Sequence, residues 1–264
     1  MKEYYFLASL LPELEIGHVP DLGMVELKEL LRVNLLPEDL LKTQRLLRQI
    51  DLENFRAFWV KEPIDPRGNL SHDGIEQALT DLAWSEKEQF PDYLVEFLEK
   101  YQEGEERFTH FQRLLVDFYA DECESNDGFL QEYFQFQRDW QLVLVGFRAK
   151  KMKKDIVAEL QYEDATDPLV AQILAQKDAA EYEPPFEYKE LRPVFEEHAN
   201  NPLELHKALY AYQFAEIVQK WGEAIFTVDR ILNYMARLIL VEKWQELDVQ
   251  KGVAVIDLIE EGVK

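Results

Sequence analysis

The chain has 264 residues, enough to bury a substantial core in one large unit or in a few packed modules. Its 29 Lys and Arg residues stand against 52 Asp and Glu residues, giving a net charge of −23, which argues against nucleic acid or an anionic membrane face as the main partner. A basic protein surface is the more natural complement. The single cysteine, Cys123, cannot form an internal disulfide, which fits the reducing cytosol.

The chain opens with an apolar run, from Tyr4 to Leu11. It is too short to cross a membrane, and its flanks do not suit a cleaved signal peptide. We therefore expect a soluble, cytoplasmic protein without direct membrane insertion, and peripheral binding to the inner membrane through a protein complex stays open. Residues 12–23 hold two prolines and two glycines and are typical of a loop.

Helical patterns joined by short connections follow up to residue 60. An amphipathic pattern begins at Leu22 and should end at Asn34. Pro37 suits the first position of the next helix, in which the basic side chains of Lys42, Arg45 and Arg48 are expected to face outward. Asp51 is a plausible N-cap for a further helix over residues 52–60. This spacing indicates antiparallel helical hairpins.

Residues 61–74 form the clearest loop of the N-terminal half, with two prolines and two glycines. Asp73 and Glu76 have the spacing of a capping box that would open the next helix. Amphipathic helices are then predicted over residues 90–101 and 108–119, separated near Gly104.

Residues 129–160 predict a central helix, because apolar side chains recur at helical spacing on two faces. One stripe comprises Phe129, Tyr133, Phe136, Trp140, Val143 and Phe147. The second comprises Leu142, Val145, Met152 and Ile156. A helix that is apolar on two faces should be buried by neighbours on both.

The remainder predicts a short helix over residues 168–177 and an irregular linker or hinge over residues 178–186, with Pro184 and Pro185. A hairpin should follow, with arms over residues 203–221 and 228–247 and Thr227 as a candidate N-cap. No segment alternates with period two over a strand length. We therefore predict an all-α fold of about ten or eleven helices in packed helical hairpins. The expected parts are residues 1–125, 126–177 and 178–264, with one continuous domain as the alternative.

Catalytic and metal-binding signatures are weak. His72 and Asp73 are adjacent, as in metal-dependent phosphohydrolases of the HD type, but lie in a glycine- and proline-containing loop. Glu15 and His18 have the Glu-x-x-His spacing of di-iron helix bundles, but no second copy of the motif exists. No P-loop, G-x-G-x-x-G, G-x-S-x-G or Cys-x-x-Cys motif is present. We expect no enzymatic activity, no cofactor and no metal site.

The sharpest local charge feature is a basic cluster at the end of the predicted central helix. Either it neutralises acidic helices of the same chain, or it is a docking point for an acidic partner element; the total charge opposes a role in nucleic-acid binding. The cluster consists of Arg148, Lys150, Lys151, Lys153 and Lys154.

Three segments together resemble an uncharacterised bacterial family encoded with V/A-type rotary ATPases, where it stands in for the C-type subunit (d-type in eukaryotic enzymes). The segments are KEYYFLASLLPEL at the start, WQLVLVGFRAKKMKKDI in the middle, and FTVDRILNYMARLILVEKWQELDVQKG near the end, with Asp229, Tyr234, Leu238, Glu242, Trp244 and Gly252. These are helical packing patterns and less specific than a catalytic signature.

The resemblance implies a non-catalytic component that links the central stalk to the membrane rotor ring and transmits torque. The C-type component is a funnel of three similar helical modules, whereas this sequence shows no clear threefold repeat. Two other hypotheses stay open: a free-standing acidic helical adaptor, and a hydrolase that uses clustered carboxylates and an unrecognised metal.

Overall fold

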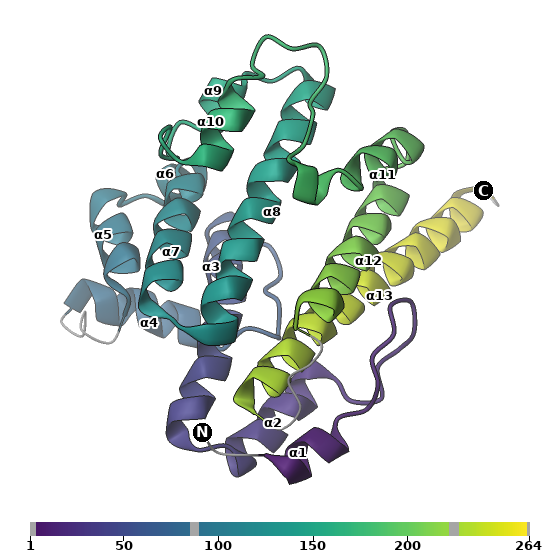
Figure 1. Ribbon diagram of the computed structural model, residues 1–264. Helices are drawn as coiled ribbons and strands as arrows, with labels where there is room; N and C mark the ends of the chain where they lie inside the picture. The colour runs from purple at the N-terminus through teal and green to yellow at the C-terminus, as the bar shows by residue number, and fades with distance from the viewer. Residues whose placement is uncertain (1–3, 85–89, 222–226, 263–264) are drawn as a thin grey trace. The chain divides into compact units, whose positions relative to one another are not determined.

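The computed structural model describes residues 4–84, 90–221 and 227–262, and of these the backbone alone for residues 81–84 and 248–262. Within these ranges thirteen α-helices and one short 3₁₀ helix follow one another, and no strand is present (Figure 1). The all-α prediction is confirmed. The number of helices slightly exceeds the prediction, in part because the short helices α6 (Gly104–Thr109) and α9 (Ile156–Glu159) occupy segments not expected to be separate helices.

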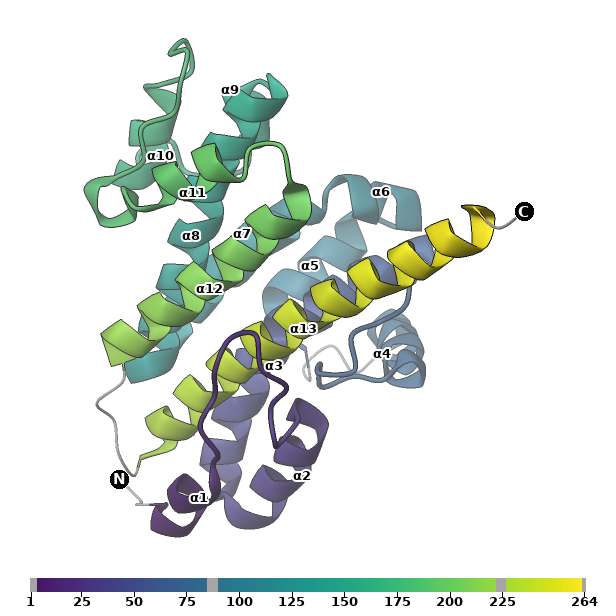
Figure 2. The ribbon, with the colours of Figure 1, turned by 90° about the vertical axis from the view of Figure 1, so that its right-hand side faces the viewer.

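The chain divides into two compact units. The first joins Met1–Thr43 to Pro193–Lys264, so the two ends of the sequence share one unit. Its long helices α12 and α13 pack against each other, and α2 packs on α13 (Figure 2). The helices of this unit are α1 (Tyr5–Leu10), α2 (Met24–Asn34), the start of α3 (Pro37–Val60), all but the first residues of α11 (Leu191–Glu197), α12 (Pro202–Trp221) and α13 (Val228–Gly262).

The second unit is continuous, from Gln44 to Arg192. Its central element is α8 (Gly128–Met152), against which α7, α9 and α10 pack. The predicted division points after residues 125 and 177 both lie inside this unit, and the three-part division stays a prediction. The unit's other helices are the remainder of α3, α4 (His72–Trp84), α5 (Asp92–Lys100), α6, α7 (Phe111–Ser125), α9, α10 (Pro168–Leu174) and the 3₁₀ helix η2 (Phe186–Tyr188).

The apolar periodicity of α8 is the reason for its central position. All six residues of the first predicted stripe, from Phe129 to Phe147, are buried. The second stripe is only partly correct, because Met152 is 62% exposed. The helix ends at Met152 and does not run to residue 160, since Lys153 adopts a left-handed conformation with φ 54° and ψ 38°.

The region predicted as two helices with a break at Asp51 is one helix, α3. Asp51 is buried within it and does not cap a helix. Its carboxylate accepts hydrogen bonds from the backbone N–H groups of Asn69 and Leu70 in the following loop. A contact with a loop eighteen residues away thus satisfies a side chain that local propensity places at a helix start.

Helix α4 begins before the predicted capping box. Ser71 precedes its first residue, and the Ser71 hydroxyl accepts a hydrogen bond from the N–H of Gly74 at 3.1 Å. Ser71 is therefore the N-cap, and Asp73 lies inside the first turn.

The C-terminal hairpin has the predicted arms, and α13 continues beyond the predicted end at residue 247. Leu238, which the apolar spacing of this arm predicts to be buried, is fully buried, whereas Trp244, predicted to be buried as well, is only partly so. The hydroxyl of Thr227 makes no hydrogen bond with the described residues, so it does not act as the predicted N-cap. The rest of the predicted connection, residues 222–226, lies outside the described residues.

Candidate functional site

The candidate site is the basic corner, which we define as Arg148, Lys150, Lys151, Lys153 and Lys154, where α8 ends and the chain turns into α9. The turn closes through the N–H of Lys154 on the carbonyl of Ala149 at 2.8 Å and the N–H of Lys153 on the carbonyl of Lys150 at 3.2 Å. This pair of hydrogen bonds is the Schellman pattern, which normally uses glycine at the left-handed position. Four of the five basic side chains are exposed, and Lys150 is partly buried.

Lys150 has a role within its own unit. Its ammonium group donates to the carbonyl oxygens of Lys177 and Ala179, at 2.7 and 2.6 Å. These bonds fix the segment after α10 to the last turn of α8. The positive charges of Lys150 and Lys151 also suit the negative end of the helix dipole.

The same segment is held on α8 by Tyr182, which is 4% exposed. Its ring packs edge-on against Phe147, with centroids 5.0 Å apart, and covers Gly146, where a Cβ atom would lie 2.5 Å from the Tyr182 ring. Burial raises the pKa of the Tyr182 hydroxyl, which has no hydrogen-bond partner in the described chain. This packing argues against the hinge predicted over residues 178–186.

Lys154 is also engaged, since it pairs with Glu159 of α9 at 3.0 Å. Asp155 caps α9 by accepting the N–H of Val157 at 2.9 Å. Lys150 and Lys154 thus make intramolecular contacts, and the side chains of Arg148, Lys151, Lys153 and Lys154 are exposed. The predicted docking role stays a prediction.

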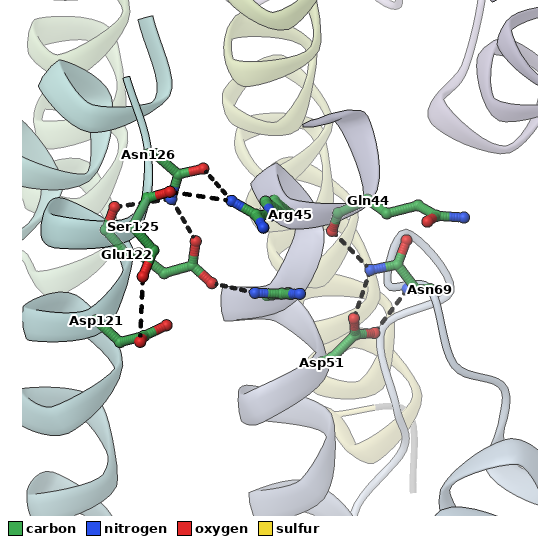
Figure 3. Close-up of polar contacts among 9 residues, drawn as sticks. Gln44, Arg45, Asp51, Asn69, Asp121, Glu122, Ser125 and Asn126 are labelled. Carbon is green, nitrogen blue, oxygen red and sulfur yellow. Dashed lines mark hydrogen bonds and ion pairs between the residues drawn. The ribbon is translucent and has the colours of Figure 1, made fainter. Parts of the chain in front are cut away.

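A second polar cluster joins α3 to the end of α7 and surrounds the fully buried carboxylate of Glu122 (Figure 3). Arg48 donates to Glu122 Oε1 at 2.7 Å, and the amide of Asn126 donates to Glu122 Oε2 at 2.7 Å. Arg45 donates to the side-chain oxygen of Asn126 at 2.9 Å. The prediction that Arg45 and Arg48 face outward is therefore wrong.

The polar partners explain why this charge can be buried, because two hydrogen bonds from an arginine and an amide replace water around the carboxylate. On the same helix, α3, Asp51 accepts from the amide of Asn69 at 2.6 Å (Figure 3). Both clusters have structural roles. The sequence contains a signal for the burial of Glu122, because this residue continues the four-residue spacing of the buried Leu114 and Phe118.

In the first unit, the opening loop packs on α13 through residues of the closing family-like segment, the stretch near the C-terminus that carries the family resemblance described above. Glu242 accepts the N–H of Met24, the first residue of α2, at 2.7 Å. Gly17, with φ +89°, lies against Trp244, because a Cβ atom there would be 3.6 Å from the indole ring. A further contact of that indole is the ammonium group of Lys207, 4.3 Å from the ring centroid.

Helix α13 also carries polar groups in the core. Tyr234 is 1% exposed, its hydroxyl has no partner among the described residues, and burial raises its pKa to about 12. Asn233, equally buried, donates weakly to the carbonyl of Trp221 at 3.3 Å. Burial lowers the pKa of the Arg237 guanidinium, which lies 5.8 Å from the ring centroid of Phe214.

The weak catalytic candidates are two separate pairs on the surface. His72 and Asp73 are strongly exposed, and the His72 ring packs on Phe58. Glu15 and His18 form an exposed pair at 3.4 Å in the opening loop. Among the residues with described positions, no group of three or more His, Cys, Asp or Glu side chains could hold a metal ion. None of the helices in the same ranges has the length and apolar character needed to cross a membrane.

Comparison with known proteins assigns the whole chain to one group. A family model described as "Protein of unknown function (DUF2764)" matches residues 1–263. Uncharacterized proteins of Chlamydia muridarum, Chlamydia trachomatis serovar D and Chlamydia pneumoniae are each 33% identical over 265 residues, covering 100% of both chains. No solved structure matches the chain.

Proposed function

Because the chain belongs to the family described as "Protein of unknown function (DUF2764)", whose description attaches no activity to it, we propose a function from its own features. The proposal is a non-catalytic accessory or rotor-linking component of a V/A-type rotary ATPase, similar in position to the C-type component. Its partners would be proteins of the central stalk and the membrane rotor ring. The relatives' names mention no rotary ATPase, so the proposal depends on the sequence resemblance and on the contacts that its residues make.

The observation that carries the proposal is the meeting of the opening and closing family-like segments in the first unit. Glu242 binds the start of α2, and Trp244 packs against Gly17 and Lys207. Leu238 and Tyr234 of the same segment are core residues. The residues that carry the resemblance therefore pack together in one unit, and the contacts they make there are structural.

The architecture also sets a limit on the resemblance. The chain forms two compact units, whereas the C-type component has three similar modules. The proposal therefore concerns the place in the complex and not a funnel shape. A net charge of −23 favours basic protein surfaces as partners and disfavours a direct role at anionic lipid.

Affinity purification at low salt from cells that produce the protein natively tests the proposal. The expected result is co-purification of V/A-type stalk and ring proteins, in amounts that fall as ionic strength rises. A matched purification through a known component of that ATPase controls for recovery of the complex. The proposal would be contradicted if purification through the ATPase component recovers the complex without this protein, and purification through this protein recovers no ATPase proteins. That result would favour the free-standing adaptor.

The hydrolase hypothesis predicts turnover by the purified protein. We expect no hydrolysis of nucleotides or phosphoesters, because the sequence has no phosphate-cradling loop and the exposed pair at His72 and Asp73 has no third ligand residue beside it in the described chain. Turnover that disappears in both His72→Ala and Asp73→Ala, with added Mn²⁺ or Mg²⁺, would establish the hydrolase.

A further inference from the structure

In the basic corner, a lysine occupies the left-handed backbone position where glycine is usual. Lys153 is one of two non-glycine residues with positive φ among the described residues, and it is exposed. Glycine adopts this conformation without the steric penalty that a Cβ atom brings. A lysine there costs stability, and its side chain makes no hydrogen bond or ion pair with any described residue. A residue that lowers stability without an intramolecular contact is a candidate for a contact with another molecule.

Apolar side chains accompany this lysine. Met152 immediately before it is 62% exposed, and Val157 at the start of α9 is 48% exposed. Residues 148–159 hold five basic and two acidic side chains, and both acidic ones are engaged, with Asp155 in the α9 cap and Glu159 in the pair with Lys154. The segment therefore carries a net positive charge, with two exposed apolar side chains within it.

Resting on the proposed function as a protein-binding component, we propose that this surface docks an acidic amphipathic helix of a partner protein. Carboxylates of that helix would lie against Lys151, Lys153 and Arg148, and its apolar side chains against Met152 and Val157. A negatively charged membrane or RNA would meet the repulsion of a chain with a net charge of −23, as would a second copy of the chain. A short acidic helix meets less of this repulsion, because exposed charges beyond about 10 Å are screened at physiological salt.

The structure supplies a matched control for Lys153. Lys61 follows α3 with φ 61°, and the same hydrogen-bond pattern forms there, with the N–H of Lys61 on Phe58 and that of Glu62 on Ala57. Lys153→Gly and Lys61→Gly should both raise Tm, by about 2 °C, because each removes the same backbone cost. Of the two variants, Lys153→Gly is the one that also removes a side chain from the basic corner.

The probe is a fluorescent helical peptide of about 20 Glu and Leu residues, with the Leu residues on one face, added to the full-length protein in low salt. We expect binding that weakens with salt, a Kd about threefold to fivefold higher in Lys153→Gly, and no change in Lys61→Gly. Met152→Ser should also weaken binding. A peptide with Lys in place of Glu should not bind.

Absence of peptide binding would overturn the proposal, as would equal effects of Lys153→Gly and Lys61→Gly. Stronger binding of phosphatidylserine vesicles or RNA, lost in Lys153→Gly, would assign the surface to that ligand instead. Self-association of the protein at the same salt, lost in Lys153→Gly, would assign it to a second copy. Failure to purify with an ATPase leaves this peptide measurement unaffected, so the two proposals can fail separately.

Discussion

At the scale of single residues, Gly146 is a position with very little room. A Cβ atom there would lie 2.5 to 2.7 Å from three atoms of Tyr182, whose ring is itself confined by Phe147. We expect Gly146→Ala to lower the free energy of unfolding by about 1–3 kcal/mol, although alanine favours helix formation.

The matched control is Gly104→Ala, whose Cβ atom would lie 3.7 Å from its nearest neighbours at Trp59. That variant should be unchanged or slightly more stable in a urea titration. In a Tyr182→Leu background, Gly146→Ala should lose most of its effect. Equal stability of the two glycine variants would show that Tyr182 does not pack on α8 as described.

Cys123 gives a second prediction at this scale. Burial raises the pKa of its thiol to about 11, and the thiolate is the reactive form. At a pH of about 8 the folded protein should react with a disulfide reagent about tenfold more slowly than free cysteine, because the lower thiolate fraction outweighs the greater nucleophilicity of a thiolate with a raised pKa. The rate should rise as the pH increases toward the raised pKa and should reach the free-thiol value in denaturant. Rapid reaction of the folded protein near neutral pH would contradict the raised pKa of the partly buried Cys123.

At the scale of elements, the polar cluster between α3 and α7 tests how these helices are held. Arg48→Ala would take away the arginine partner of the fully buried Glu122 carboxylate and leave the Asn126 amide donating to it. We expect a loss of about 2–3 kcal/mol in the free energy of unfolding. Combining Arg48→Met with Glu122→Leu should recover most of it, because both polar partners are then absent.

The control for this pair is Arg32→Ala. It breaks the pair with Glu29, in which both side chains are 68% exposed. It should therefore cost less than about 1 kcal/mol. An effect of Arg48→Ala as small as that of Arg32→Ala would show that Glu122 is hydrated and not buried against Arg48.

The helices were largely predictable, and their ends and polar contacts less so. The periodicity from Phe129 to Phe147 predicts the buried stripe of α8, because apolar spacing reports burial directly. The end of α8 has no such signal, since Lys153 occupies a position that normally holds glycine. The continuity of α3 through Asp51 depends on a loop that folds back onto it, and local sequence does not show that contact.

The basic corner was predictable as a cluster but not as a set of roles. Sequence alone brings five basic residues together and leaves neutralisation and docking as alternatives. The three-dimensional contacts separate Lys150, bound to the carbonyls of residues 177 and 179, from Lys153, which makes no such bond within the described chain. The contacts of Lys150 are thus structural, and the docking role of the exposed residues stays a prediction.

At the scale of the whole molecule, the protein is acidic, and its described parts are all-helical. The residues singled out above either stabilise the fold or lie on the surface. The family-like residues Glu242 and Trp244 hold the opening loop on α13. Four of the five basic side chains of the basic corner are exposed, and its role as a docking surface is the proposal made above. This arrangement suits a linking component, because such a component needs a stable scaffold and binding surfaces.

Cross-linking in intact cells that produce the protein natively, followed by mass spectrometry, tests this central claim most directly. We predict cross-links from Lys151 and Lys153 to stalk or ring proteins of a V/A-type ATPase, and their loss in the Lys151→Glu/Lys153→Glu variant, which should remain folded. Cross-links among the ATPase proteins themselves provide the internal control. If those form while this protein is cross-linked only to unrelated proteins, the proposed place in the ATPase is wrong.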